Sequence, residues 1–276
     1  MKTVIRILLI LILLGVIAVM LSIYNSEPAQ QDVLDEQTFE EEVEEMQIST
    51  QNSRVDFLPS TDGTSRVVLT GNSDDFTLTA DLSDGRLEIE IEDRSRFFNF
   101  DFSRSYSLQV YVPENGLASL SADSDNGAIQ AVNIQADELA LEADNGRIEL
   151  QNVESERVHV QTDNGRIELT GMDAEIIARS SNGRITFTDV SGSLQAQASN
   201  GRIELTTATL DFPVDFETNN GRIEIRTDSE PTNARIQARV DNGNIDVYGQ
   251  ESEEVLFGDG DALIRLTSNN GSIVVQ

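Results

Sequence analysis

The sequence contains no cysteine and no tryptophan, and it has a single lysine and a single histidine. Without cysteine, a disulfide framework, a thiolate zinc site and a lipidated cysteine anchor are all excluded. His159 alone leaves few routes to imidazole catalysis, and we expect it to be an ordinary outward residue of a strand. Aromatic residues make up only 5% of the chain, which disfavours a sugar-binding groove built on ring stacking.

Positive charge is also scarce, because 49 acidic side chains face only 19 basic ones and the formal net charge is -30. Such a surface repels phosphate backbones, so we expect no nucleic-acid partner.

One long apolar run lies near the N-terminus, where residues 7–26 carry no charge. This length matches the hydrocarbon core of a bilayer, and Lys2 and Arg6 precede the run while acidic residues follow it. We therefore predict a signal-anchor transmembrane helix at 1–24, a cytoplasmic N-terminus and an extracytoplasmic remainder. A cleaved signal peptide is the alternative, although no good small-x-small cleavage site follows the run.

Residues 25–45 are rich in Gln and Glu and are predicted to be an acidic linker, either solvated or containing a short helix. Residues 46–276 are predicted to form the folded domain.

The most informative feature of that domain is a series of Asn-Gly pairs whose glycines lie 18 to 22 residues apart, with a last interval of 28. The asparagines are Asn126, Asn145, Asn164, Asn182, Asn200, Asn220, Asn242 and Asn270, and the glycines are Gly127, Gly146, Gly165, Gly183, Gly201, Gly221, Gly243 and Gly271. A repeat of this length is typical of units that stack to bury a shared core.

Apolar and polar residues alternate on both sides of each Asn-Gly pair, which indicates two half-buried strands joined at a corner. An antiparallel meander of hairpins would also show Asn-Gly between strands. A meander does not require the same residue at the same phase of every unit, whereas a parallel solenoid stacks equivalent residues into ladders. We therefore predict an all-β parallel β-solenoid (β-helix) of about 10 to 12 coils with 18- to 22-residue repeats.

In this solenoid the asparagines are expected to point inward as a ladder of hydrogen-bonded amides, and each glycine is expected to have a positive φ. Arginine and glutamate rows alternate on the outer surface beyond the corner, as in Arg147 and Glu149. They form either a charged docking face or a solvated sheet surface.

Two places depart from the repeat. The aromatic cluster Phe97, Phe98, Phe100 and Phe102 is expected to be either a capping loop or a partner-binding patch. The final strand at 273–276 reaches the C-terminus uncovered, so we expect the long unit after Gly243 to fold over it, or a second subunit to bind end to end.

No catalytic, cofactor or metal site is expected. The Asp-Asn-Gly and Gly-Asp-Gly-Asp segments match neither the twelve-residue calcium loop nor the nonapeptide of calcium-binding β-rolls. Carboxylates recur at the same phase in successive units, whereas a catalytic pair departs locally from its repeat.

The segment Tyr111-Val112-Pro113, followed by Leu120-Ser121-Ala122 and the serial Ser/Thr/Asp-Asn-Gly-x-Ile units, resembles the β-strand-repeat family of bacterial and archaeal adhesin-like proteins, a domain family of unknown function. The likeness covers 46–276, although Arg often replaces the Asp or Asn usual after the glycine. It implies a β-solenoid displayed outside the membrane and carries over no catalytic residue.

The resulting hypothesis is a membrane-tethered, non-catalytic interaction, adhesion or scaffold module of the cell envelope, with an envelope protein or surface ligand as partner. An accessory regulator of envelope stress signalling is the alternative, and a polysaccharide-active enzyme is a weaker one.

Overall fold

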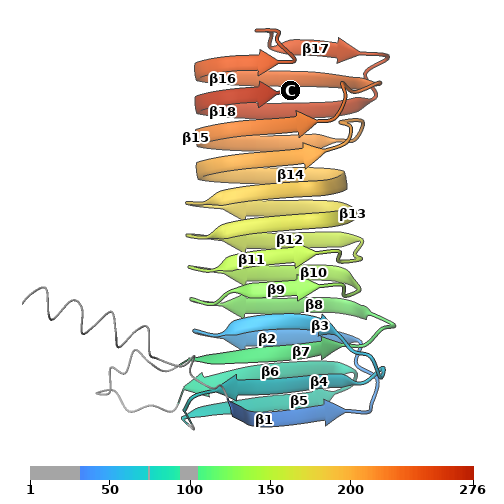
Figure 1. The fold of residues 1–276 in the computed structure, drawn as a ribbon, viewed down its shortest axis with the longest axis vertical. Coiled ribbons are helices and arrows are strands. Elements are labelled where there is room, and N and C mark those ends of the chain that lie inside the picture. The colour runs from blue at the N-terminus through green and yellow to red at the C-terminus, as the bar shows by residue number, and fades with distance from the viewer. Residues whose placement is uncertain (1–31, 74, 94–104) are drawn as a thin grey trace, which may run out of the picture. The chain divides into compact units, whose positions relative to one another are not determined.

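The computed structural model describes residues 32–73, 75–93 and 105–276. The predicted transmembrane helix at 1–24 and the cluster Phe97, Phe98, Phe100 and Phe102 lie outside the described residues. Within the described ranges, no helix has the length and apolar character needed to cross a membrane. Residues 33–276 form one compact unit, which Figure 1 shows as a tall stack of strands.

The described residues form 18 strands joined in one sheet that winds around the core. Their bounds are β1 (Asp32–Phe39), β2 (Glu45–Thr50), β3 (Arg54–Pro59), β4 (Ser65–Gly71), β5 (Phe76–Ser83), β6 (Arg86–Asp93), β7 (Tyr106–Val112), β8 (Leu117–Ser124), β9 (Ile129–Val132), β10 (Ala136–Ala143), β11 (Arg147–Gln151), β12 (Arg157–Thr162), β13 (Arg166–Ser180), β14 (Arg184–Thr207), β15 (Val214–Thr227), β16 (Ala234–Val247), β17 (Glu254–Phe257) and β18 (Ala262–Val275).

Strand pairing in the body of the stack is parallel, as a solenoid requires and a meander forbids. Leu139 of β10 pairs with Val158 of β12, and Ile148 of β11 pairs with Ile167 of β13, so each residue lies on its equivalent one repeat away. The later strands β14, β15, β16 and β18 run through the Asn-Gly corner without a break and bend around one long edge of the stack (Figure 1). The predicted all-β parallel solenoid is therefore correct for the described part of the chain.

The core is a column of stacked aliphatic side chains. The isoleucine two residues after each repeat glycine has no exposed surface, except at the half-buried Ile245. Burying each such side chain stabilises the fold by roughly 1.5–3 kcal/mol relative to leaving it in water. Two larger residues also contact each other in the core: the rings of Phe187 and Phe216, whose partners in register are Leu169 and Ala196, stack with centroids 5.4 Å apart.

The order of coils in space differs from the order in the chain at the N-terminal end. Strand β2 pairs in parallel with both β6 and β8, and β3 pairs with both β7 and β9. The coil formed by β2 and β3 therefore lies between two coils that follow it in the sequence.

The same inversion occurs at the C-terminal end, and it corrects the prediction of an open end. Strand β18 pairs in parallel with both β15 and β16, so Asn270 is adjacent to Asn220 on one side and to Asn242 on the other. The final strand thus fills a place inside the stack, and β16 is the outermost full coil. The long unit after Gly243 does cover the end, because β17 pairs antiparallel with β16.

Antiparallel strands also close the N-terminal end, where β5 pairs with β6 and β4 pairs with β7. Strand β1 pairs with β4 and extends this cap. Residues 32–39 are thus a strand of the folded unit instead of the expected acidic linker or short helix. An antiparallel strand thus joins the outer coil at each end, but β17 covers only Ala234–Gln237 of β16, so end-to-end association stays a prediction.

Candidate ligand-binding surface

The repeat asparagines form a continuous ladder of side-chain hydrogen bonds along one edge of the stack. Each Nδ2 donates to the Oδ1 of the asparagine in the adjacent coil, at distances from 2.9 to 3.1 Å. In spatial order the members are Asn52, Asn126, Asn145, Asn164, Asn182, Asn200, Asn220, Asn270 and Asn242. Asn52 was missed by the sequence analysis because Ser53, and not glycine, follows it.

The ladder lies on the surface, so the expectation that the asparagines point inward is wrong. The inward position of the corner belongs to the residue two places earlier, which is Thr162, Thr218 or Ser268 in three of the coils. Their hydroxyls donate to the carbonyl oxygen of the corner glycine in the adjacent coil, at 3.2, 3.3 and 3.2 Å respectively. The corner interrupts the inward and outward alternation of side chains along the strand. Extending that alternation across the corner therefore predicted the wrong side for the asparagines.

The corner glycines are required by close backbone approach and not by a positive φ. A Cβ on Gly165 would lie 1.6 Å from the carbonyl oxygen of Gly146, and the other corner glycines show the same overlap at 1.5 to 1.9 Å. Among them only Gly243 has a φ in the positive range, at +153°. The predicted reason for glycine is therefore wrong, whereas the need for it is explained by the stacking of one corner directly on the next.

A second corner uses left-handed residues. Asn133, Asn152, Gly171 and Asp189 have φ values of 53°, 50°, 65° and 51°, and each lies four residues after a buried isoleucine. Asn and Asp tolerate this conformation better than other residues with a side chain. Their shared position, four residues after the buried isoleucine of each unit, is the sequence pattern that marks this corner.

Arginine and glutamate rows run side by side just beyond the asparagine ladder. The arginines are Arg147, Arg166, Arg184, Arg202 and Arg222, and the glutamates are Glu149, Glu168, Glu204 and Glu224. The arginine side chains are 43–53% exposed and the glutamates only 7–31%, so the guanidinium groups form the outer layer. Most of these arginines contact a glutamate at 2.6 to 3.8 Å, whereas Arg184 reaches Glu204 only at 4.0 Å.

Two shallow hollows lie along this edge, between the asparagine ladder and the arginine row. One, of about 570 Å³, is lined by residues 145–147, 164–166 and 183–184. The other, of about 400 Å³, is lined by residues 201–202, 220–222 and 271–272. The glycines have no side chain and form the floor, while asparagine amides and guanidinium groups form the walls.

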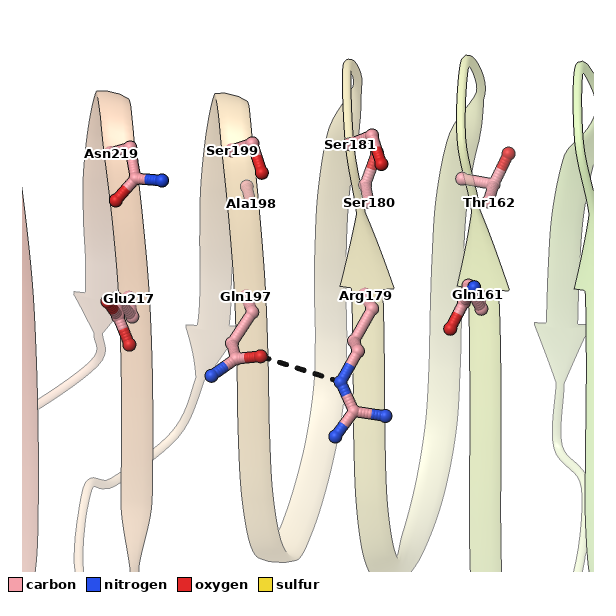
Figure 2. Close-up of a pocket in the computed structure, with 10 residues that line it drawn as sticks. All are labelled: Gln161, Thr162, Arg179, Ser180, Ser181, Gln197, Ala198, Ser199, Glu217 and Asn219. Carbon is pink, nitrogen blue, oxygen red and sulfur yellow. Dashed lines mark hydrogen bonds between the residues drawn. The ribbon is translucent and has the colours of Figure 1, made fainter.

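A third hollow, of about 280 Å³, lies on the strand segments that precede the corner, on the other side of the asparagine ladder from the arginine row. Figure 2 shows Gln161, Arg179, Gln197 and Glu217 standing in a row on neighbouring strands, with Arg179 Nε donating to Gln197 Oε1 at 3.5 Å. His159 lies half-buried beside Arg179, and burial together with that positive charge lowers the pKa of its imidazole. This surface is polar and shallow, and His159 is kept neutral near pH 7.

Comparison with known proteins places the chain in a family. A family model described as Toastrack DUF4097 matches residues 43–276. The chain belongs to the Toastrack DUF4097 family. No curated protein matches it.

Among solved structures, the chain is similar to a putative adhesin from Bacteroides fragilis NCTC 9343, with a TM-score of 0.51 and 14% identity over 88% of this chain and 96% of that one. A putative adhesin from Parabacteroides merdae ATCC 43184 has a TM-score of 0.45 and 10% identity, over 88% and 95% of the two chains. The first of these similarities shows the fold of the Toastrack domain.

The remaining candidate groups of the Toastrack domain are explained by folding. The described residues contain no group of three or more His, Asp or Glu side chains placed to hold a metal ion. In the Gly-Asp-Gly-Asp segment, the Asn233 amide donates to the Asp261 carboxylate at 2.8 Å, and the Gly260 N–H donates back to Asn233 Oδ1 at 2.7 Å. That segment therefore joins a loop to its neighbouring coil.

Proposed function

We propose that this Toastrack protein is a membrane-tethered, extracytoplasmic module that binds through its surface and catalyses no reaction. The observation that carries the proposal is the repetition of its polar chemistry in rows that run along many successive coils. The asparagines bond to asparagines and the arginines contact glutamates, coil after coil, so the polar groups form a long patterned surface. The structural relative described as a putative adhesin supports the same class of function.

The arrangement of carboxylates supports a non-catalytic role. Solenoid glycosidases hold an acid and a base roughly 5 to 9.5 Å apart, and the acid has a raised pKa. Burial, aided by the charges of Asp125 and Asp144, raises the pKa of Asp123, which borders a shallow hollow of about 180 Å³. Glu142 lies in register with Asp123, but it accepts a hydrogen bond from Gln161 at 3.2 Å and continues the same row of polar residues. The glutamates near the hollows beside the asparagine ladder are already paired with arginine.

The tether rests on the sequence of the first 31 residues. The uncharged run at 7–26, with Lys2 and Arg6 before it and acidic residues after it, favours an anchor whose C-terminal side lies outside the cytoplasm. In this arrangement the Toastrack domain is outside the cytoplasm, where components of the cell envelope can reach it.

The test uses the full chain in proteoliposomes and, as a matched control, proteoliposomes carrying only residues 1–42, which end before the family match. Both are applied to immobilised protein, polysaccharide and lipid fractions of a bacterial envelope. We expect the full chain to be retained on at least one fraction and the control on none. Equal retention of the two would contradict a binding role, and release of soluble sugars from the polysaccharide fraction would contradict the absence of catalysis.

A further inference from the structure

We infer that the two hollows beside the asparagine ladder form one groove, here called the corner groove, and that it binds a linear polysaccharide bearing carboxylate groups. This inference rests on the proposed function and names its ligand class. The groove has a glycine floor, one wall of asparagine amides and one wall of arginines, and it spans residues 145–147 to 271–272 in successive coils.

The two hollows are continuous because the coils that bound them are adjacent. Asn200 donates to Asn182 at 2.9 Å, and a Cβ on Gly201 would meet the carbonyl oxygen of Gly183 at 1.7 Å, so no coil separates the first hollow from the second. With coils spaced about 4.8 Å apart, the groove runs past six coils, of which the first five carry an arginine, along roughly 24 Å. A ligand that fills it must therefore be long, narrow and regular.

Positive charge is concentrated in this groove although the chain as a whole is strongly acidic. Five successive coils place an exposed arginine on the same wall, and the neighbouring glutamates offset part of that charge. The offset is weakest at Arg184, because its own coil carries Thr186 where the neighbouring coils carry Glu168 and Glu204. Arg184 is 50% exposed and lies in the middle of the groove, where the two hollows meet.

Both walls offer hydrogen-bond donors. An amide nitrogen carries two hydrogens and the ladder uses one of them, which leaves the other directed away from the ladder. A guanidinium presents a planar fork that matches the two oxygens of a carboxylate. These donors would bind a ligand whose carboxylates contact the arginines on one side of the glycine floor. Its hydroxyl oxygens would accept hydrogen bonds from the asparagine amides on the other side.

The repeat distance and the composition favour a polysaccharide over other polyanions. The spacing of the coils is comparable to the length of one pyranose unit, so successive sugars of an extended chain would lie opposite successive coils, and those carboxylates that face the arginine wall could contact it. The groove offers no aromatic ring on which bases could stack, which disfavours a single-stranded nucleic acid. Salt screens the repulsion between the ligand and distant acidic residues more strongly than it screens the short contacts within the groove.

The experiment measures calorimetric binding of polygalacturonate to the full chain in a non-ionic detergent, with fully methyl-esterified polygalacturonate as the uncharged control polymer. We expect binding of the acidic polymer only. Thr186→Glu gives Arg184 an internal carboxylate and should weaken binding about tenfold, the effect of losing one charge-assisted hydrogen bond. Thr188→Glu adds the same charge on the same strand, one outward position farther from Arg184, and should change binding little.

Arg184→Gln should also weaken binding about tenfold, whereas Arg157→Gln, which removes the same charge from the opposite face, should not. Unchanged thermal unfolding of each variant shows that the fold is retained. Equal binding of the two polymers, equal effects of the two glutamate variants, or a preference for single-stranded DNA would overturn the inference. If polygalacturonate does not bind but the proteoliposomes are still retained on an envelope fraction, the ligand class is wrong and the proposed function stands. If both fail, so does the proposed function.

Discussion

Replacing Gly165 by alanine tests the close stacking of the corners. The added Cβ would lie 1.6 Å from the carbonyl oxygen of Gly146 and 2.5 Å from Thr162 Oγ1, and the first overlap is with backbone that cannot rotate away. The two coils must therefore separate locally, which strains the packing by about 1–3 kcal/mol. Separation also weakens corner hydrogen bonds such as Asn164 N to Asp144 O, now 2.8 Å, and two such bonds contribute about 1 kcal/mol each. We expect a total loss of about 3–5 kcal/mol.

The assay is urea unfolding of the full chain followed by far-ultraviolet circular dichroism. Gly63→Ala is the matched control, because a Cβ on Gly63 would meet no atom within 4 Å, although the residue has a φ of +79°. It should lose only the roughly 1 kcal/mol that a left-handed backbone costs an alanine. If Gly165→Ala lost no more than Gly63→Ala, the glycine ladder would not be explained by backbone contact.

Three further predictions concern the stacking order, the amide ladder and pH. The chain has no cysteine, so pairs of introduced cysteines can test the stacking order. Cysteines that replace Glu217 and Thr267, which are paired in register, should form a disulfide on oxidation, whereas cysteines that replace Glu217 and Arg239 should not. A disulfide between positions 217 and 239 would instead indicate that β16 lies next to β15. Asn164→Ala should cost only about 1 kcal/mol in urea unfolding, because the ladder lies in water, and a loss above about 3 kcal/mol would indicate a buried amide. His159→Gln should reduce the loss of stability as the pH falls below 6.5, since the lowered pKa means that the unfolded chain takes up the proton first; an unchanged pH profile of the unfolding free energy would rule this out.

The parallel solenoid could be predicted because identical residues recur at one phase of every unit. Ile148 is in register with Ile167, and Asn145 is hydrogen-bonded to Asn164. Both pairs form because each coil packs on an equivalent coil. A regular alternation specifies which strand residues face the core, and the structure agrees along the strands.

The errors arose where that regularity ends. At the corner the chain changes direction, so the alternation before it does not determine the side of Asn145, and the inward place falls to the residue two positions earlier. The stacking order at the two ends could not be read from the sequence either. The repeat phase of β18 suits any neighbouring coil equally well, so it does not indicate that β18 returns between β15 and β16.

The central claim is that the exposed arginine row is a binding surface and that the rest of the repeat serves folding. Arginine-specific chemical modification of the full chain, read by mass spectrometry with and without polygalacturonate, tests it most directly. Arg166, Arg184 and Arg202 should become protected when the polymer is present, while Arg157 on the opposite face keeps its reactivity. Protection of Arg157 to the same degree, or no protection at Arg184, would contradict the claim.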